Sequence, residues 1–406
     1  MKICMITWSY WPGLEGGAER QCRKVVKNLA RKGVESVVLT SLSSFKFNRR
    51  SEDGETIVLR YGWLCPLAEW LRRLMLRLVT AKGGRFETGL RALLFWLMLP
   101  FEWLARLSFI IDILLFFPRN NDGIDLIHVH ETAWLAGFGG YLGKKNGIPV
   151  YCKVRNTPAL DVIGYDTPFR SFWSRMRTET SFIALNPYLK EELIVAGIPE
   201  KRISIIPNGV DLPDLSAKES QPGTVLYVGN FSQGASHKGF DVLLKGWSEI
   251  GKVNPEAHLI LVGGGDYNGW LARAKIYGCE NSLTFTGSVE DPARYYQQAS
   301  VFLLPSRHEG MSNALLEAQS WGLACVVSDI PANLAVVDDG VNGITFPVGN
   351  SCKLAEMTTK ILSDEKLKIQ LGENARHKAE MDFDIEKIVD QLISLYMLAI
   401  EKKDFA

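Results

Sequence analysis

The sequence of 406 residues lacks the features that mark several common protein classes. Its seven cysteines form no C-x-x-C pair and have no histidines at metal-ligand spacing, which excludes a disulfide framework and a zinc motif. The net charge of +1 gives no global attraction for nucleic acid. No secretory cleavage site follows the first apolar residues. These absences predict a folded protein with reduced, buried thiols, and we expect it to be cytoplasmic.

The sequence also lacks the motifs of several enzyme classes. It has no G-x-S-x-G elbow, no P-loop and no G-x-G-x-x-G turn, so a serine hydrolase, a P-loop enzyme and a dinucleotide-binding enzyme are not indicated. The one Asp-x-Asp, at 382–384, lies in the C-terminal tail, away from any predicted strand end, and is typical of a solvated turn or cap. We therefore expect no metal site and no metal-dependent transfer chemistry.

What the sequence does contain is two series of short apolar strands that alternate with helical patterns. Such alternation is typical of parallel sheets covered by helices on both faces. A polar stretch with two prolines separates the series. The predicted strands are 2–7, 35–40, 56–60, 125–130, 149–154, 181–185 and 203–206 in the first series, and 224–229, 258–263, 283–286, 301–304 and 324–328 in the second.

This organisation predicts an α/β protein with two doubly wound domains. We assign 1–205 to the N-terminal domain, 206–223 to a linker and 224–384 to the C-terminal domain. Residues 385–406 are predicted to form a final helix, and a crossing back to the N-terminal domain is one interpretation of it. Ligands of such sheets bind beyond the carboxyl ends of the strands.

The most informative segment is 306–318, which joins a buried strand to a helix. Glu309 lies in the turn, Glu317 lies about one turn inside the helix, and Ser312 occupies a capping position between them. A helix start offers unpaired backbone N–H groups to an anion, and flanking carboxylates can accept hydrogen bonds from hydroxyls. The combination suits a phosphorylated sugar.

Each half also carries a glycine turn after a strand. Residues 12–17 lead the first strand into a helix that begins near Ala18, and residues 261–266 end a strand of the second half. Glycine lets the backbone approach a phosphate closely, but a turn that merely needs glycine explains either segment as well. Lys238, in the loop after strand 224–229, is placed to neutralise a diphosphate.

Two histidines and an arginine follow strands of the first half. His128 and His130 lie on one face of strand 125–130, because side chains alternate along a strand. We interpret His130, at the tip, as a cleft residue and His128 as packed beneath it. A metal site at this pair would lack a third ligand. Arg155, just past strand 149–154, is also placed for the cleft, with a solvated surface arginine as the alternative.

These motifs resemble those of the retaining, family-4 type glycosyltransferases, including those that build bacterial surface polysaccharides. The resemblance covers essentially the whole chain, and its most specific part is the match of Glu309 to Glu317 with the E-x7-E signature. Segments 16–20, 127–131, 206–211 and 238–239 support it. The resemblance implies the GT-B fold, in which two Rossmann-like domains face each other across an interdomain cleft.

The resemblance also implies roles for individual residues. Glu309 would contact the donor sugar, Glu317 would hold the ribose, and Lys238 would stabilise the departing nucleoside diphosphate. The catalytic residues would be Glu309, Lys238 and His130, and the donor-binding residues would be Gly16, Gly17, Gly310, Met311, Ser312, Asn313, Glu317, Asn230 and Arg155.

Asn230 departs from the family pattern, which usually has an arginine there, paired with the later lysine. The diphosphate then lacks one expected cation unless Arg20, Arg155 or Arg307 reaches it. This departure keeps open a non-catalytic, transferase-like partner as one alternative function. A nucleotide-sugar epimerase or isomerase on the same fold is another.

Segment 62–118 is unusually apolar and aromatic. Its seven Lys or Arg and four acidic residues give a local charge of +3, and its longest uncharged run, Ala92–Phe101, has ten residues. Because a membrane span needs roughly 20 apolar residues, we expect no transmembrane helix. A helix pair lying in the interface of an anionic leaflet is one interpretation, and packing of 93–117 into the first domain is the other.

The predicted function is therefore transfer of a hexosyl group, with retention, from a nucleotide-diphosphate sugar. The resemblance implies front-face attack guided by the leaving phosphate, with no metal and no other cofactor. A saccharide or lipid-linked acceptor in cell-surface polysaccharide synthesis is expected, together with peripheral contact to the inner face of the plasma membrane through 62–118. No nucleic acid partner is expected.

Overall fold

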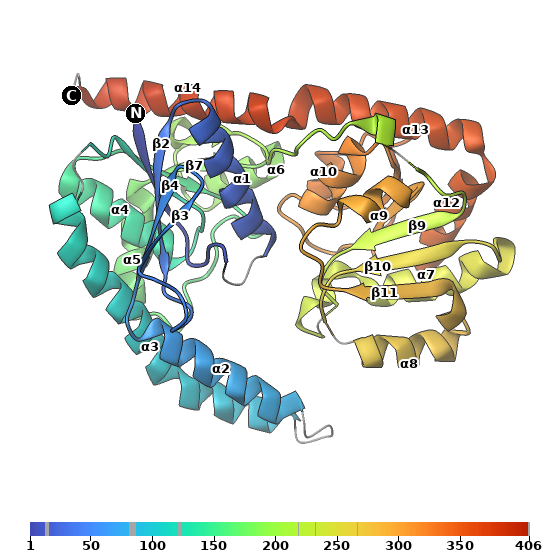
Figure 1. Ribbon diagram of the computed structural model, residues 1–406, viewed down its shortest axis with the longest axis horizontal. Helices are drawn as coiled ribbons and strands as arrows, with labels where there is room; N and C mark the ends of the chain where they lie inside the picture. Colours follow the sequence, from blue (N-terminus) through green and yellow to red (C-terminus); the bar gives the residue numbers. More distant parts are fainter. Residues whose placement is uncertain are drawn as a thin grey trace. The chain divides into compact units, whose positions relative to one another are not determined.

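The computed structural model describes residues 1–12, 16–80, 87–120, 123–217, 219–231, 233–265 and 267–404. The chain forms two compact units, each with its own sheet (Figure 1). Unit 1 contains Met1–Leu185, Leu189–Ile206 and the chain from Val389 onward, whereas unit 2 contains Asn186–Tyr188 and Pro207–Ile388. Nearly all of the segment predicted as a linker therefore belongs to unit 2.

Unit 1 is built on an eight-stranded sheet with the order β3-β4-β2-β1-β5-β6-β7-β8. All neighbouring strands are parallel except the pair β3 and β4, and β3 is a short antiparallel edge strand that sequence reasoning missed. The strands are β1 (Lys2–Ile6), β2 (Glu35–Ser41), β3 (Arg50–Asp53), β4 (Thr56–Tyr61), β5 (Leu126–Val129), β6 (Val150–Lys153), β7 (Ser181–Ala184) and β8 (Ile203–Ile205).

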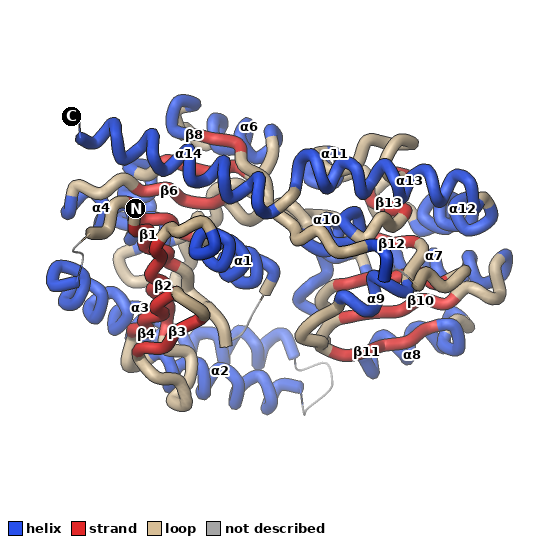
Figure 2. Tube along the Cα trace, turned by 45° about the horizontal axis from the view of Figure 1, so that its top comes forward, coloured by secondary structure: helices blue, strands red, loops and turns tan. Residues whose placement is uncertain are grey.

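Helices connect the parallel strands of unit 1 (Figure 2). The first, α1, ends at Arg31, and Gly33 follows with a φ of 74°, a left-handed conformation that glycine adopts without strain. The α-helices are α1 (Gly17–Arg31), α2 (Cys65–Thr80), α3 (Glu87–Asn120), α4 (Trp134–Asn146), α5 (Arg170–Met176), α6 (Pro187–Val195) and the unit 1 part of α14 (Ile385–Asp404).

Unit 2 is built on a six-stranded, fully parallel sheet with the order β11-β10-β9-β12-β13-β14. Its strands are β9 (Thr224–Val228), β10 (His258–Val262), β11 (Leu283–Gly287), β12 (Val301–Leu304), β13 (Ala324–Ser328) and β14 (Ile344–Phe346), of which sequence reasoning missed β14. Its α-helices are α7 (Phe240–Val253), α8 (Tyr267–Tyr277), α9 (Ala293–Gln298), α10 (Asn313–Ser320), α11 (Pro331–Leu334), α12 (Ser351–Ser363) and α13 (Glu365–Lys378).

Both sheets place the first strand of their series at the point where the strand order reverses. In unit 1 this point lies between β1 and β5, and in unit 2 it lies between β9 and β12. Doubly wound sheets bind ligands at the carboxyl ends of the strands that flank this point. The predicted two-domain, parallel α/β architecture is confirmed in each unit.

The final helix, α14, begins in unit 2 and continues in unit 1 from Val389 onward. In unit 1 the hydroxyl of Tyr396 is hydrogen-bonded to Nδ1 of the fully buried His128. The predicted packing of His128 beneath the strand tip is therefore confirmed. The Asp-x-Asp motif acts as a cap at the start of α14, because Oδ1 of Asp384 accepts a hydrogen bond from the backbone N–H of Glu386 at 3.0 Å.

The predicted helix pair in 62–118 is present as α2 and α3, which run side by side and extend away from the sheet of unit 1 (Figure 1). The C-terminal half of α3 is packed into unit 1 through Phe109, Ile113 and Phe117, which are buried. The rest of the hairpin exposes large apolar side chains. The C-terminal half of α3 also exposes Ile111, Leu115 and Phe116, so each of the two interpretations describes part of this helix. Residues 81–86 lie outside the described residues. Among the described helices, none is long and apolar enough to span a bilayer.

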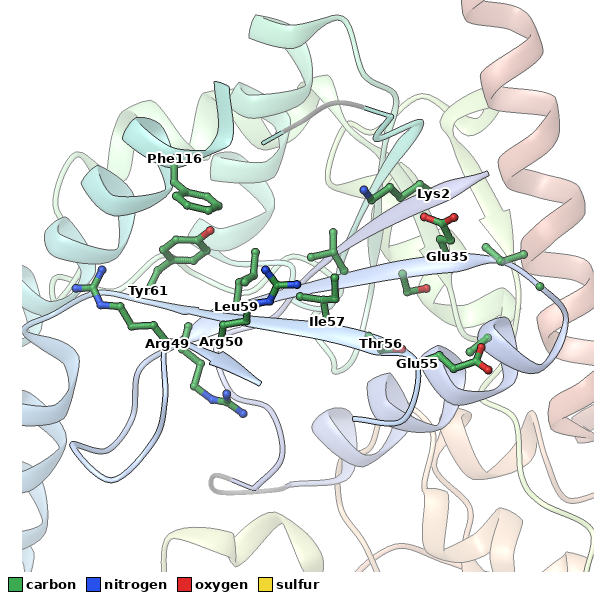
Figure 3. Close-up of a pocket in the computed structure, with 16 residues that line it drawn as sticks. Lys2, Glu35, Arg49, Arg50, Glu55, Thr56, Ile57, Leu59, Tyr61 and Phe116 are labelled. Carbon is green, nitrogen blue, oxygen red and sulfur yellow. The ribbon is translucent and has the colours of Figure 1, made fainter. Parts of the chain in front are cut away.

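A groove of about 610 Å³ lies over one face of the unit 1 sheet (Figure 3). Ile57 and Leu59 of β4 line its floor, and Phe116 of α3 packs against Tyr61 at one end, with ring centroids 5.4 Å apart. Lys2, at the start of β1, lies at the other end. The groove follows the face of the sheet and is lined by none of the predicted site residues.

The cysteines are all free, and six of the seven are buried. The predicted state of the thiols is therefore confirmed, with exposed Cys352 as the exception.

Candidate functional site

The predicted site residues of unit 2 gather at the carboxyl ends of β9 and β12. Asn230 and Lys238 follow β9, whereas Glu309 and the start of α10 follow β12. These two strands are neighbours in the sheet and flank its point of reversal. The parallel topology therefore brings together residues that are about 70–80 positions apart in sequence.

Glu309 and Lys238 form an ion pair at the centre of this group. The Nζ of Lys238 donates a hydrogen bond to Oε1 of Glu309 at 2.7 Å, and the hydroxyl of Ser306 donates to the same oxygen at 2.7 Å. The side chain of Lys238 is 24% exposed, and that of Glu309 is 9% exposed. The Glu309 carboxylate is thus fixed in position before any ligand binds.

The turn that carries Glu309 packs closely against the segment 239–241 at the start of α7. Gly239, with a φ of 66°, lies so close to Pro305 that an added Cβ would be 1.9 Å from the Pro305 carbonyl oxygen. Arg307 donates two hydrogen bonds to the carboxylate of Asp241, both at 2.8 Å, and this side-chain pairing raises the pKa of Arg307. Glycine at 239 is required by this close approach of two backbones.

The start of α10 is capped as predicted. The Ser312 hydroxyl accepts a hydrogen bond from the backbone N–H of Leu315 at 3.4 Å. Glu317 lies within α10, and its Oε2 accepts a hydrogen bond from the Tyr296 hydroxyl at 2.9 Å. The two carboxylates of the motif therefore lie on different elements, with the N-terminus of α10 between them.

Two asparagines hold the turn that precedes α10. The side-chain amide of Asn186 donates to the carbonyl oxygen of Gly310 at 2.9 Å. The side-chain amide of Asn208 donates to Oδ1 of Asn313 at 2.9 Å, and the Asn208 backbone N–H donates to Sδ of Met311 at 3.3 Å. These contacts stiffen residues 310–313, whose backbone N–H groups are the predicted donor-binding groups.

Asn230 stands at the end of β9 and is exposed. Of the arginines considered as replacements for the missing family arginine, Arg307 is held by Asp241, and Arg155 belongs to unit 1, where its Nε lies 3.9 Å from Oδ2 of Asp161. The donor-binding roles of Asn230 and Arg155 stay predictions.

The second glycine turn has a packing explanation. Gly263 has a φ of 144°, and an added Cβ would lie 1.8 Å from the carbonyl oxygen of Gly229. Glycine is therefore required at position 263, because the backbone after β9 passes too close for a side chain. Asp266, which ends this predicted turn, lies outside the described residues, as does Ser232 in the loop before Lys238.

In unit 1 the first glycine turn leads into α1. Gly16 is the N-cap residue of α1, and its backbone N–H donates to Oε2 of Glu19 at 2.9 Å, while Gly17 is the first residue of the helix. Residues 13–15 of this turn lie outside the described residues. The phosphate-facing role of Gly16 and Gly17 stays a prediction.

Polar side chains are buried at the carboxyl ends of β5 and β6 in unit 1. His130 is 6% exposed and stacks on His128, with ring centroids 4.4 Å apart. Burial, and after it the charge of Lys153, lowers the pKa of His130 to about 3, so its imidazole is neutral at physiological pH. Burial also lowers the pKa of Lys153 to about 8. His130, which the sequence predicted as a cleft residue, therefore has a buried side chain.

Sequence reasoning missed several residues of these two groups. Ser306, Tyr296 and Asn186 carry no motif that marks them, because each acts through a contact that only the fold creates. Asn208 lay within a segment interpreted as a linker. Lys153 could have been found, since a lysine that ends an apolar strand is unusual.

The chain matches known families over both units. Residues 15–213 match the family described as "Glycosyltransferase Family 4", and residues 222–364 match "Glycosyl transferases group 1". An N-acetyl-alpha-D-glucosaminyl L-malate synthase of Bacillus anthracis is 30% identical over 68% of this chain and 75% of that protein.

Other relatives align over shorter spans. An uncharacterized glycosyltransferase of Haemophilus influenzae is 30% identical over 47% of this chain, and the chain spans about half of its length, 53%. A UDP-Gal:alpha-D-GlcNAc-diphosphoundecaprenol alpha-1,3-galactosyltransferase of Escherichia coli is 29% identical over 50% of this chain and 56% of that protein. Among solved structures, sucrose-phosphate synthase of Thermosynechococcus elongatus shares the fold, with a TM-score of 0.74, 20% identity and 99% of both chains covered.

Proposed function

The chain belongs to the family-4 glycosyltransferases, and from that membership we propose that it transfers a hexosyl group, with retention, from a nucleotide-diphosphate sugar. The proposed reaction needs no metal ion. The proposed acceptor is a saccharide or a lipid-linked saccharide of cell-surface polysaccharide synthesis.

The observation that carries this proposal is the pairing of Lys238 with Glu309 beside the N-terminus of α10. Cleavage of the anomeric C–O bond builds negative charge on the leaving diphosphate. Lys238 has three N–H donors, of which one reaches Glu309. Asn186 and Asn208 fix the segment 310–313 through the Gly310 carbonyl oxygen and the Asn313 side chain, which leaves its backbone N–H groups out of these bonds. Donors fixed before the reaction stabilise such charge in the manner of an oxyanion hole.

The two acidic residues support transfer rather than hydrolysis by a carboxylate pair. Glycoside hydrolysis uses two carboxyl groups that flank the bond as acid and as base or nucleophile. In unit 2, Glu309 is ion-paired to Lys238, and Glu317 is bonded to Tyr296 on a separate element. We assign Glu309 to the sugar hydroxyls and Glu317 to the ribose. With neither carboxylate acting as a nucleophile, retention is proposed to result from front-face attack assisted by the leaving phosphate.

The names of relatives suggest the substrate class. The Escherichia coli relative uses a UDP-sugar and a diphosphoundecaprenol-linked acceptor, by its name. A UDP-sugar donor and a polyprenyl diphosphate-linked acceptor are therefore the first substrates to test.

The direct test incubates the full chain with UDP-, GDP- and ADP-sugars plus membrane lipid extract and follows release of the nucleoside diphosphate. We expect release with one donor class, dependent on lipid extract, and strongly reduced in Glu309→Ala and Lys238→Ala. Release that both variants retain would show that the site is wrong. A change of the sugar without acceptor would favour the epimerase alternative, and no release with any donor would favour the non-catalytic partner.

We also propose that the α2–α3 hairpin binds the surface of an anionic membrane, where a lipid-linked acceptor would be met. Exposed aromatic side chains are unusual in such number on one part of a soluble surface. They include Trp63, Trp70, Trp96, Phe101 and Trp103. Tryptophan favours the membrane interface, because its ring is apolar and its N–H is polar.

The charges of the hairpin support an anionic surface. Arg72 and Arg73 are about half exposed, whereas Glu69, which pairs with both, is 16% exposed. A neighbouring loop adds exposed Tyr165 to this surface, and the Trp103 indole N–H donates to its carbonyl oxygen at 2.6 Å. The face therefore offers positive charge and aromatic rings together, which matches an interfacial helix.

Flotation with vesicles tests this surface. We expect the protein to float with vesicles that contain phosphatidylglycerol, less so with neutral vesicles, and to lose flotation in the double variant Trp70→Ser, Trp96→Ser. A matched control is Tyr277→Ser, an exposed aromatic residue of unit 2. No flotation of the unmodified protein at low salt would contradict the proposal.

A further inference from the structure

Lys153 occupies an unusual position in unit 1. It is the last residue of β6, and the register pairs His128 of β5 with Tyr151 of β6. His130 and Lys153 each lie two residues farther along, so their side chains point from the same face of neighbouring strands. Both side chains stand at the carboxyl ends of strands, next to the point where the strand order reverses.

Lys153 is buried without a partner. Its side chain is only 4% exposed, and its Nζ has no hydrogen-bond partner among the residues that the structure describes. Within the same residues, no carboxylate pairs with it. The buried Nε2 atoms of His128 and His130 also have no partner in the described part of the chain. Unsatisfied polar atoms are thus concentrated at one place in unit 1.

Neighbouring groups do not neutralise the lysine. Cys22 of α1 lies close enough to interact electrostatically, but burial raises the pKa of its thiol, so it is uncharged. His130 and His128 are neutral, because burial lowers their pKa values. Tyr396 and Tyr151, which pack on this face, also have raised pKa values and are uncharged. Among the residues that the structure describes, the positive charge of Lys153 therefore has no counterion.

A buried ammonium without a counterion costs stability, since charge is poorly solvated inside a protein. A ligand that supplies the missing negative charge would offset this cost. An oxyanion would pair with the lysine, and a neutral imidazole beside it can donate one further N–H. A neutral hydroxyl ligand would leave the charge unpaired.

We propose that Lys153, with His130 beside it, binds a phosphate oxyanion of a substrate. The source of the phosphate is either the diphosphate of the nucleotide sugar or the diphosphate of a lipid-linked acceptor; only this choice of sources rests on the proposed function. Lys153 is then a binding residue of unit 1, in addition to Lys238 of unit 2.

Thermal stability tests the proposal without an activity assay. In the full chain, inorganic pyrophosphate is expected to raise the melting temperature of the unmodified protein, and Lys153→Met is expected to abolish this rise. Without pyrophosphate, Lys153→Met is expected to melt at a higher temperature than the unmodified protein, because it removes a buried, unpaired charge. Lys153→Arg, which keeps the charge, is expected to retain at least part of the pyrophosphate effect. Lys145→Met, at an exposed lysine of α4, is the matched control and should change neither quantity.

Direct binding measurements distinguish the two sources. If the donor supplies the phosphate, Lys153→Met is expected to weaken UDP binding at least tenfold in calorimetry, with farnesyl diphosphate binding unchanged. If the acceptor supplies it, the effects are reversed. The proposal is overturned if Lys153→Met binds pyrophosphate, UDP and farnesyl diphosphate as tightly as the unmodified protein. It is equally overturned if the variant is folded but less stable. Loss of glycosyl transfer alone would bear on the proposed function and leave these binding results standing.

Discussion

Two lysines, one at the end of β6 in unit 1 and one in the loop after β9 in unit 2, have opposite surroundings. Lys238 of unit 2 donates to Glu309 at 2.7 Å and remains partly exposed. Lys153 of unit 1 is buried, and none of the described residues accepts a hydrogen bond from it. The charge of Lys238 is therefore balanced by Glu309, whereas the charge of Lys153 is proposed to be balanced by an anion of a bound substrate.

The difference bears on how each unit prepares for a ligand. A paired lysine is oriented in advance and adds little electrostatic cost to the free protein. An unpaired buried lysine costs stability that binding of an anion would restore. Unit 2 is therefore preorganised, and unit 1 is expected to gain stability from its ligand.

The largest expected effect comes from removing the acidic half of the paired site. Glu309→Gln keeps the size of the side chain but cannot orient Lys238 or the sugar through a charge. We expect kcat for transfer to fall by roughly 10²–10³, the loss typical of a preorganised electrostatic group. Glu249→Gln, at an exposed glutamate that pairs with Lys252, is the matched control and should have full activity. Activity within a few-fold of normal would remove Glu309 from the site.

The unpaired lysine should be visible in the pH dependence of stability. Because the folded pKa of Lys153 is about 8 and its ordinary value is 10.5, the unfolded chain binds more protons between these values. The free energy of unfolding of the unmodified protein should therefore rise, relative to Lys153→Met, as pH increases from about 8 to about 10.5. The rise should be on the order of 3 kcal/mol. Parallel urea titrations across this range measure it, and two parallel curves would show that Lys153 is not buried as a charge.

Removal of the paired lysine, Lys238, should lower the free energy of unfolding, whereas removal of Lys153 at neutral pH should raise it. Within the described part of the chain, Lys238→Met leaves Glu309 with the Ser306 hydroxyl as its one hydrogen-bond partner, so we expect a loss of roughly 1–3 kcal/mol in the free energy of unfolding. Urea denaturation at neutral pH gives the value. If Lys238→Met and Lys153→Met shift stability in the same direction, the contrast between the two sites is wrong.

The smallest expected effect concerns the support of Glu317. Tyr296→Phe removes the hydroxyl that donates to Glu317 at 2.9 Å, which is worth roughly 0.5–1.5 kcal/mol. We expect KM for the donor to rise by up to about tenfold, with kcat little changed, if Glu317 holds the ribose. A fall in kcat at constant KM would instead assign Glu317 to the chemical step.

Most of the fold could be predicted from the sequence. Buried parallel strands are continuous apolar runs, and helices begin and end at recognisable caps, as at Ser312 and Gly33. The strands β3 and β14 were missed for a physical reason. β3, with the sequence Arg-Ser-Glu-Asp, has no apolar residue. β14, with the sequence Ile-Thr-Phe, is followed at once by Pro347, whereas the equally short β8 is extended by the apolar Ile206, so β14 gives no comparable apolar run.

The site was predictable only in part. Glu309, Lys238 and Glu317 could be named because their types and spacing match a family motif. Asn186 and Tyr296 could not, because their roles depend on hydrogen bonds across more than 100 and more than 20 positions, respectively. The burial of His130 could not be predicted from the sequence either, because it depends on the packing of the folded unit, in which His130 stacks on His128 and α14 contacts His128 through Tyr396.

The most direct test of the central claim follows the anomeric proton by NMR during transfer from the competent donor to its acceptor. We predict a product with the same anomeric configuration as the donor, formed by the unmodified protein and not detectably by Glu309→Gln. A product of inverted configuration, or the same product formed at an equal rate by the variant, would contradict the account.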